Sequence, residues 1–175
     1  KEVKPGDLIV AVGGPTGRDG LHGATFSSTT MDGETDRTAV QIGHPLNEKR
    51  VLDAMMVARD RKLYRGVTDC GAGGFSSAIG ELARDCGARV ELEKAPLKCS
   101  DLEPWEIWLS EAQERMVLAV PPKSFPELER LFHAEGTGCS VLGEFTNTGR
   151  LVVTHKGARV ADLDIVQGRV RGVVL

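Results

Sequence analysis

Two glycine-rich stretches follow short apolar runs, and in each of them the backbone could lie close to a ligand. The first covers Gly13 to Ser28, directly after the apolar run 8–12. Glycine permits positive φ and close backbone approach, so successive N–H groups there could point at a phosphate. A P-loop is not indicated, because no Lys-Ser/Thr follows the last glycine, and a dinucleotide-binding turn is not indicated, because no helix begins at once. A flexible surface loop over 13–37 is the alternative that the composition allows.

The second glycine-rich stretch, Asp69 to Gly74, joins a predicted strand to a predicted helix. Asp69 could simply cap this helix. It could also bind Mg²⁺, because hard cations take carboxylate oxygens, often only one or two, and complete their shell with substrate phosphates. The glycines that could let a phosphate approach the backbone of the two stretches are Gly17, Gly20, Gly23, Gly71 and Gly73.

Polar side chains crowd together in a third stretch, Leu109 to Met116, directly before a predicted strand. A run of charges is usually a solvated face, and that alternative stays open here. The functional interpretation is a hydrogen-bonding edge for a polar substrate, in which the amide of Gln113 both donates and accepts. Gln41 is a similar amide directly before a predicted helix.

The histidines and cysteines do not form a metal-binding or disulfide pattern. No HxxxH, HExxH or CxxC spacing occurs among His22, His44, His133, His155, Cys70, Cys86, Cys99 and Cys139. A zinc site and a disulfide framework are therefore not expected. Because the N-terminal residues contain no apolar signal segment, we expect reduced thiols in a cytoplasmic protein.

The length and composition are typical of one folded domain. The chain has 175 residues, of which 41% are hydrophobic and 27% are charged, as in ordinary globular domains. Lys and Arg number 22 against 25 Asp and Glu, a net charge of −3, so no basic field would attract nucleic acid or an anionic membrane. No apolar run approaches the roughly 18 residues of a membrane span.

The candidate residues need a scaffold in which strands and helices alternate. Apolar positions at helical spacing predict helices over 46–61, 75–86 and 126–132, with Pro45 in the first turn of the first helix and Ser124 as the cap of the last. A helical turn is predicted at 104–109. Strands are predicted at 7–12, 64–68, 89–93, 115–120, 140–145, 150–155 and 159–163. Asn147–Gly149 and Lys156-Gly157 are typical of hairpin turns. This order predicts an α+β domain with a mixed or antiparallel sheet and helices.

Four motifs in a fixed order resemble one enzyme family. They are Pro5 to Leu8 with Val12 to Ser28, Gln41 to Pro45 with Glu48 to Arg50, Thr68 to Gly74, and Leu109 to Met116. In this order they resemble the synthetase subunit of formylglycinamide ribonucleotide amidotransferase, also called phosphoribosylformylglycinamidine synthase. The resemblance extends from about Lys4 to Leu163.

The resemblance implies a fold and a domain organisation. The family belongs to the superfamily of aminoimidazole ribonucleotide synthetase, whose members pair an ATP-binding N-terminal half-barrel domain with a C-terminal α/β domain. Residues 1–175 resemble the C-terminal kind, which has a partly ferredoxin-like sheet, and they begin where that domain begins. We therefore expect a single substrate-side domain, excised from a longer multidomain synthetase.

The resemblance also implies a reaction of de novo purine biosynthesis. ATP activates the formyl-amide oxygen of formylglycinamide ribonucleotide by phosphorylation, and ammonia from a glutaminase subunit or domain displaces phosphate to give the amidine. The family's catalytic His and most of its ATP ligands lie in the preceding domain, so we expect no catalytic residue here and no activity from this chain alone. The expected cofactors are Mg²⁺ and ATP, and the expected partners are the half-barrel domain and the glutaminase.

Carried over residue by residue, the resemblance assigns Asp69 to Mg²⁺. It assigns the substrate-binding role to Gln41, Glu111, Ala112 and Gln113. The family usually has Ser at the position of Ala112, so a side-chain hydroxyl contact is missing here and only a backbone contact could remain. We expect Gln41, Asp69 and Gln113, which are remote along the chain, to face one cleft.

Two alternatives stay open. The chain could belong to another ligase or kinase of the superfamily, such as aminoimidazole ribonucleotide synthetase or a small-molecule kinase. It could also be a non-catalytic copy of the domain that binds a structural nucleotide or a partner subunit. The stretch from Glu111 to Gln113 argues against the first alternative, and the presence of Gln41, Asp69 and Gln113 together favours a catalytic copy over the second.

Overall fold

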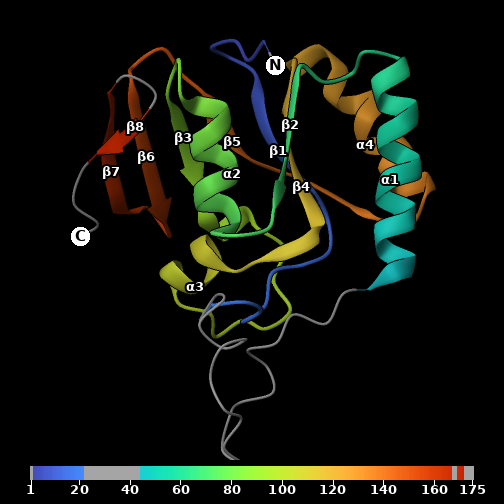
Figure 1. The fold of residues 1–175 in the computed structure, drawn as a ribbon, viewed down its shortest axis with the longest axis horizontal. Helices are drawn as coiled ribbons and strands as arrows, with labels where there is room; N and C mark the ends of the chain where they lie inside the picture. Colours follow the sequence, from blue (N-terminus) through green and yellow to red (C-terminus); the bar gives the residue numbers. More distant parts are fainter. Residues whose placement is uncertain (1, 22–43, 167–168, 172–175) are drawn as a thin grey trace, which may run out of the picture.

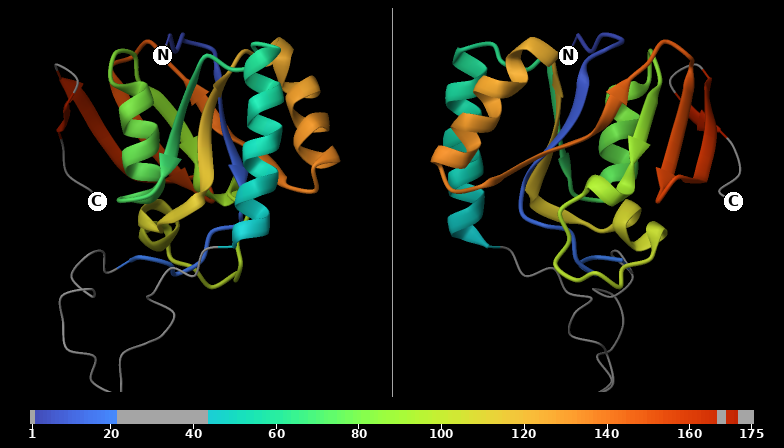
Figure 2. Two further views of the ribbon diagram at one scale, coloured as in Figure 1. Left: turned by 45° about the vertical axis from the view of Figure 1, so that its right-hand side comes forward. Right: turned by 180° about the vertical axis from the view of Figure 1, so that it is seen from behind.

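An eight-stranded mixed sheet with helices on both faces forms the described fold (Figures 1 and 2). The computed structural model describes residues 2–21, 44–166 and 169–171. The strands are β1 (Leu8–Gly13), β2 (Gly66–Cys70), β3 (Ala88–Glu91), β4 (Ala112–Val120), β5 (Gly138–Phe145), β6 (Arg150–His155), β7 (Ala158–Val166) and β8 (Arg169–Arg171). The helices are α1 (Pro45–Asp60), α2 (Gly74–Ala83), α3 (Pro104–Leu109) and α4 (Phe125–Ala134), with 3₁₀ turns at 92–94 and 122–124.

The strands follow one another across the sheet in the order β2-β4-β1-β5-β3-β6-β7-β8. The β3–β6 pair is parallel and the other pairs are antiparallel, so the predicted mixed sheet of an α+β domain is confirmed. The predicted hairpin turn at Asn147–Gly149 is wrong, because β3 lies between β5 and β6. Backbone hydrogen bonds from Thr146 and Gly149 to Gly87 and Cys86 show that this segment carries the chain across the beginning of β3. Lys156-Gly157 does join a hairpin, that of β6 and β7.

The apolar run of β1 has a packing layer on each face. Ile9 and Ala11 belong to one buried cluster with α2, whereas Val10 and Val12 belong to a second cluster with α1 and α4. A strand that is covered on both faces needs apolar side chains at successive positions, which is why this run does not alternate. Figure 2 shows that α1 and α4 cover only the part of the sheet around β1 and β4, while β6 and β7 lie beyond them.

Several strand boundaries differ from the sequence prediction. β2 covers 66–70 and not 64–68, because it follows the register of β4, in which Gly66 pairs with Ala119 and Asp69 with Met116. β4 begins at Ala112, three residues before the predicted start at 115, so much of the third polar stretch belongs to the sheet. β8, over 169–171, was not anticipated from the sequence.

The start of α1 follows the local sequence signal, whereas the start of α4 does not. Pro45 lies in the first turn of α1 as predicted, and the N-cap His44 accepts at Nδ1 from the N–H of Asn47 over 3.2 Å. Ser124 stands at the N-cap of α4, but its hydroxyl makes no capping hydrogen bond, so the predicted cap is wrong. The reason is local: a 3₁₀ turn leads directly into α4, and Ser124 is already in the right-handed helical region. Among the described residues, no helix is long and apolar enough to cross a membrane.

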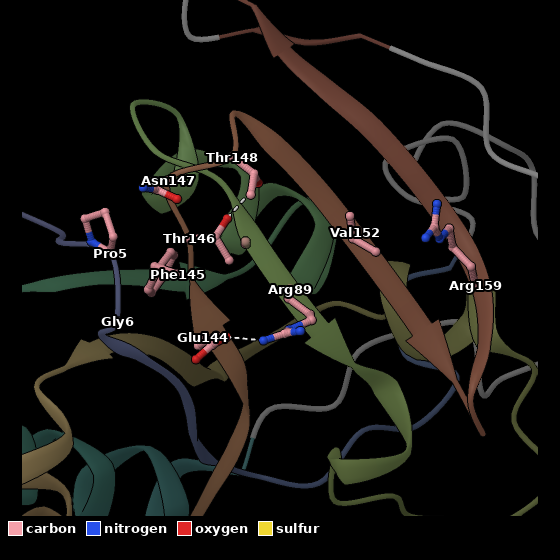
Figure 3. Close-up of a pocket in the computed structure, with 11 residues that line it drawn as sticks. Pro5, Gly6, Arg89, Glu144, Phe145, Thr146, Asn147, Thr148, Val152 and Arg159 are labelled. Carbon is pink, nitrogen blue, oxygen red and sulfur yellow. Dashed lines mark hydrogen bonds and ion pairs between the residues drawn. The ribbon is translucent and has the colours of Figure 1, made fainter.

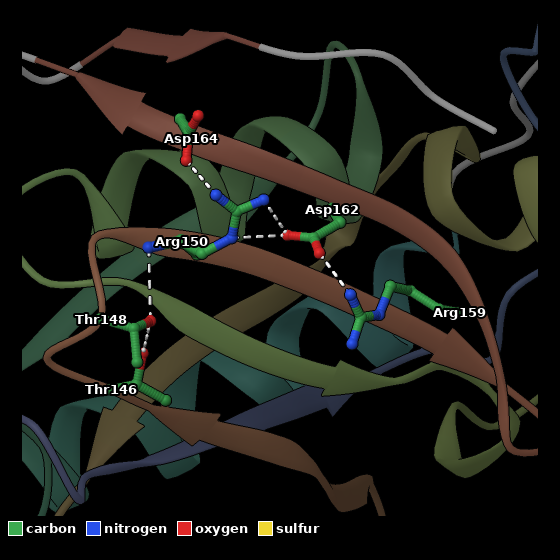
Figure 4. Close-up of polar contacts among 6 residues, drawn as sticks. All are labelled: Thr146, Thr148, Arg150, Arg159, Asp162 and Asp164. Carbon is green, nitrogen blue, oxygen red and sulfur yellow. Dashed lines mark hydrogen bonds and ion pairs between the residues drawn. The ribbon is translucent and has the colours of Figure 1, made fainter.

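Ion pairs tie β6 to β7 in the part of the sheet that lies beyond α1 and α4 (Figure 4). Arg150 on β6 contacts Asp162 and Asp164 on β7, with its Nε 2.8 Å from Asp162 Oδ1. Arg159 Nη1 donates to the other oxygen of Asp162 over 2.6 Å. The hydrogen bond from Arg150 is the main cause that lowers the pKa of Asp162. Because the arginines of these pairs lie partly in solvent, the pairs contribute little free energy to the stability of the fold.

Candidate functional site

The chain segments that carry the predicted site residues meet at one end of the sheet. β1 and β2 end there and β4 begins there, since Gly13 pairs with Arg115 and Cys70 pairs with Ala112. α2 starts at the same end, directly after β2 (Figure 1). Antiparallel pairing therefore brings together segments that are far apart in the sequence.

Glu111 links the two glycine-rich stretches. Its backbone N–H donates to the carbonyl of Asp19 over 2.9 Å, and its Oε1 accepts from the N–H of Gly73 over 3.3 Å. Gly73 is the N-cap of α2 and makes no side-chain capping hydrogen bond, and the Glu111 carboxylate accepts from the N–H of this N-cap residue itself. A negative charge is favoured there by the helix dipole. The predicted substrate-binding residue Glu111 is thus held between the two stretches.

Asp69 caps the turn before α2 and not the helix itself. Its Oδ1 accepts from the N–H of Gly71 over 2.9 Å, while Gly73 stands at the N-cap, so the simpler prediction of a helix cap is wrong. Asp69 is exposed, and its Oδ2 has no hydrogen bond or ion pair within the described part of the chain. A free carboxylate oxygen at the surface suits a Mg²⁺ ion that takes few protein ligands.

The first glycine-rich stretch, described up to residue 21, is held by hydrogen bonds between Thr16 and Asp19 and the rest of the chain. The N–H of Thr16 donates to Pro96 O, and its carbonyl accepts from the N–H of Lys98, both over 2.7 Å. Lys98 Nζ also lies 2.6 Å from Asp19 Oδ2. These bonds argue against a free surface loop over 16–19, whereas residues 22–37 of the predicted loop lie outside the described residues.

The predicted phosphate-approach glycines of this stretch make close contacts within the chain. A Cβ atom at Gly20, whose φ is +66°, would lie 2.7 Å from the Cβ of Glu111. A Cβ atom at Gly17 would lie 2.8 Å from Lys98 Cδ. Gly20 therefore requires glycine whether or not a phosphate binds, whereas the flexible Lys98 side chain could move away from a Cβ atom at Gly17. The role of both glycines toward phosphate stays a prediction.

The other predicted site residues are placed only in part. Ala112 is 3% exposed and its backbone pairs with Cys70, so little of it is open to a ligand here. Gln113 lies in β4 beside a register shift in the β2–β4 pairing, and its side chain is not among those described. Gln41 and Gly23 fall in 22–43, outside the described residues. The expected convergence of two amides and one carboxylate therefore stays a prediction.

Sequence reasoning missed the buried Arg115. Arg115 is 1% exposed, and its guanidinium donates to Thr16 Oγ1 over 2.6 Å and to Ser110 O over 2.5 Å. The same group lies 4.2 Å from the ring centroid of Phe75. One signal could have identified it: a charged residue in phase with the inward-facing apolar residues of a predicted strand.

Arg18, in the first glycine-rich stretch, pairs with two carboxylates. Its Nε donates to Glu106 Oε1 over 2.8 Å, and its Nη2 lies 3.2 Å from Asp101 Oδ2. The hydrogen bond from Arg18 holds the pKa of Glu106 below its usual range. Glu106 also accepts from the N–H of Glu103 over 2.8 Å in the capping box of α3, so this pair ties the stretch to α3.

We expect Glu106→Gln to lower stability in a pH-dependent way. Because Arg18 lowers the pKa of Glu106 in the folded state, the ionised carboxylate stabilises the fold above its ordinary value of 4.5. That stabilisation is lost as the pH falls through the lower folded value. Wild type should therefore unfold at a higher temperature than the variant at pH 7, with a difference that shrinks below about pH 4.5. Gln retains an oxygen for the capping box.

Glu93→Gln is the matched control for this prediction. Glu93 is exposed and has no ion pair within the described residues. Its replacement removes the same formal charge without removing a partner, so the unfolding temperature should change little at either pH. A difference between wild type and Glu106→Gln that is constant from pH 3.5 to pH 7 would contradict the assigned role of Arg18.

A pocket at the opposite end of β1 contains none of the predicted site residues. It has a volume of about 600 Å³ and lies where β1 begins and β5 ends (Figure 3). Arg89 of β3 and Glu144 of β5 form an ion pair there. Because Gly13 and the site segments lie at the other end of β1, this pocket is separate from the candidate site.

Several known proteins are similar to this chain in sequence. Residues 4–156 match the family model of AIR synthase related protein, C-terminal domain. Phosphoribosylformylglycinamidine synthase subunit PurL of Thermoplasma acidophilum is 40% identical over 169 residues, which are 94% of this chain and 22% of that protein. The PurL subunit of Methanopyrus kandleri is 44% identical over 155 residues, 86% of this chain and 21% of its own length. The chain spans about a fifth of the length of the curated relatives it matches.

Solved structures share the fold. Thermotoga maritima PurL complexed with FGAR has a TM-score of 0.84 and 34% identity, and the match covers 94% of this chain and 28% of that one. T. maritima PurL complexed with ATP has a TM-score of 0.81 and 31% identity, and the match covers 94% of this chain and 26% of that one. The structure of PurLQS from the same organism has the same TM-score and identity, and the match covers 95% of this chain and 26% of that one. The expected fold of the aminoimidazole ribonucleotide synthetase C-terminal type is confirmed.

Proposed function

Since this chain belongs to the family of AIR synthase related protein, C-terminal domain, we propose that it is the substrate-side domain of a phosphoribosylformylglycinamidine synthase. The complete synthetase would convert formylglycinamide ribonucleotide into formylglycinamidine ribonucleotide with ATP and glutamine-derived ammonia. Because the chain covers 22% of a curated relative, we propose that residues 1–175 are one domain of a longer polypeptide and that activity needs the remainder.

The position of Glu111 is the observation that carries this proposal. Its carboxylate and backbone connect the first glycine-rich stretch to the turn that follows Asp69. Glu111 therefore connects three stretches that carry the family's motifs, at one end of the sheet. Relatives whose names give this activity match 94% of the chain, and a solved relative is described with FGAR bound.

The chemistry proposed for this surface is mainly positioning. The γ-phosphoryl group of ATP passes to the amide oxygen of the substrate, and ADP leaves. The ammonia nitrogen then bonds to the carbon that bears this oxygen, and the carbon–oxygen bond breaks as phosphate leaves. Phosphoryl transfer depends on alignment and charge neutralisation more than on covalent help from the protein. Glu111 keeps acceptor capacity beyond its bond to Gly73, because a carboxylate has about four lone-pair sites. Gln41 and Gln113 are proposed to orient neutral amide groups without adding charge.

Asp69 is the residue that we propose to hold Mg²⁺. Its exposed, unpaired Oδ2 fits a cation that uses one or two carboxylates together with phosphate oxygens. The ion would neutralise phosphate charge beside the substrate. Within the described residues there is no cluster of three or more His, Cys, Asp and Glu side chains suited to a metal, so further ligands are proposed to come from ATP, water and the neighbouring domain.

The partners and location also belong to this proposal. ATP would be bound mainly by an adjoining half-barrel domain, and ammonia would come from a glutaminase subunit or domain. A solved relative described as PurLQS supports an assembly with further subunits.

A cytoplasmic location is proposed because all four cysteines are free, as expected in a reducing compartment. Burial raises the pKa of Cys139 to about 12, which keeps this thiol unreactive.

Turnover by the complete synthetase tests the proposal. With formylglycinamide ribonucleotide, ATP, Mg²⁺ and ammonia, we expect equal amounts of amidine product and ADP. Residues 1–175 alone should give neither, because the ATP-binding domain is missing. Amidine formation by this chain alone would contradict its proposed incompleteness. Phosphorylation of thiamine monophosphate by the complete protein, without amidine formation, would favour another reaction of the superfamily.

A further inference from the structure

The buried side chain of Arg115 contacts three segments of the candidate site. Its Nη1 donates to Thr16 Oγ1 over 2.6 Å, and its Nη2 donates to Ser110 O over 2.5 Å. The guanidinium carbon lies 4.2 Å from the ring centroid of Phe75. Thr16 belongs to the first glycine-rich stretch, and Ser110 directly precedes Glu111. Phe75 is the second residue of α2.

Stability alone does not explain why an arginine stands at this position. Within the described part of the chain, Arg115 forms no ion pair with a carboxylate, and its Nε and the hydroxyl of Ser110 have no hydrogen-bond partner. A buried charge without an ionic partner is costly, and an apolar residue of similar volume is often at least as stable. Local breaches of the packing rules of this kind are expected at functional sites.

We propose that Arg115 is a positioning residue of the substrate cleft, which fixes Glu111 and the first glycine-rich stretch relative to α2 without touching the substrate. The guanidinium is planar and rigid, so hydrogen bonds from its two terminal nitrogens fix Thr16 and Ser110 relative to each other. The ring of Phe75 holds the plane of this group against α2. The inference rests on the proposed function, because positioning Glu111 matters for activity only if Glu111 binds the substrate.

Arg115→Lys in the complete synthetase is expected to lower kcat/KM for formylglycinamide ribonucleotide roughly 10²-fold, the effect of misplacing site groups by about 1 Å. A single ammonium group lacks the fork that reaches both acceptors. The KM for this substrate should rise, because Glu111 is no longer held in place. Thr16→Val removes one acceptor and keeps Arg115, so it should raise the same KM with a smaller loss.

Arg65→Met is the matched control. Arg65 Nη1 lies 2.7 Å from Oδ1 of the buried Asp7 at the opposite end of β1, so this variant disturbs a buried polar contact far from the site by leaving Asp7 without its ion pair. It should unfold at a lower temperature but keep the wild-type KM. If Arg115→Lys and Thr16→Val also lower only the unfolding temperature, with KM and kcat per folded enzyme unchanged, the positioning role is overturned.

Hydrogen–deuterium exchange of the same complete proteins needs no substrate and separates this inference from the proposed function. In Arg115→Lys and Thr16→Val, the backbone amides of position 16, Lys98 and Glu111, which bond across the site, should exchange faster than in wild type and in Arg65→Met. If wild type does not turn over the substrate but these amides respond as expected, the proposed function fails and the positioning role stands. Unchanged exchange at these amides would overturn the positioning role whatever the activity.

Discussion

Asp69→Asn in the complete synthetase is expected to lower kcat roughly 10²–10³-fold and to raise the Mg²⁺ concentration at half-maximal rate. A metal ion that neutralises transferring phosphate contributes several kcal/mol, and each 1.4 kcal/mol is about a factor of ten. Asn keeps the oxygen that accepts from the N–H of Gly71, so the turn should persist. The loss should therefore come from the missing charge at the exposed Oδ2.

Asp85→Asn is the control for this prediction. Asp85 is an exposed carboxylate just beyond the opposite end of α2, so its replacement removes the same formal charge from the chain without altering the site. Its Mg²⁺ dependence should equal that of wild type. An Asp69→Asn enzyme with lower kcat but an unchanged Mg²⁺ dependence would remove Asp69 from the metal shell.

The second large effect is expected from Gly74→Ala. Gly74 begins α2 with φ +54°, and a Cβ atom there would lie 2.2 Å from the carbonyl oxygen of Ser110. The left-handed conformation costs an alanine about 1–2 kcal/mol, and forcing an extra methyl group against packed backbone costs about 1–3 kcal/mol more. The backbone before Glu111 must also shift, so kcat/KM should fall together with the free energy of unfolding.

Gly149→Ala separates the two costs. Gly149 has a similar φ of +66°, but no atom lies within 4 Å of its added Cβ. Its variant should lose only the conformational part, about 1–2 kcal/mol, with unchanged kcat/KM. Equal losses in stability and activity for Gly74→Ala and Gly149→Ala, measured by denaturant unfolding and turnover, would show that contact with Ser110 is unimportant.

The parts of the fold that depend on local signals were predictable from the sequence. Pro45 and the apolar stripe behind it place α1 correctly, and the apolar run before Gly13 is β1. The end of β2 was not predictable, because its register is set by pairing with β4, which lies far away in the sequence. The Asn147–Gly149 turn failed for the same reason: a turn signal shows that the chain bends, but not that β3 lies between the two strands.

The sequence could predict which chain segments form the candidate site, but it could not predict the contacts between those segments. The motifs indicate the stretches that carry Asp69 and Glu111, and antiparallel pairing places both at the same end of the sheet. The hydrogen bonds of Glu111 to Asp19 and Gly73 depend on tertiary geometry and leave no pattern in the sequence. Arg115 was overlooked because a charged residue at the beginning of a strand is ordinarily solvated, whereas here loops and α2 bury it.

The most direct test of the central claim is a structure of the complete synthetase with formylglycinamide ribonucleotide, Mg²⁺ and a non-hydrolysable ATP analogue. We expect Mg²⁺ at about 2.0–2.1 Å from an oxygen of Asp69. We also expect the substrate within hydrogen-bond distance of Glu111, with Gln41 and Gln113 facing the same ligand. Ligands bound instead at the opposite end of β1, beside Glu144, or an Asp69 carboxylate that faces away from them would contradict the claim that this end of the sheet binds the substrate.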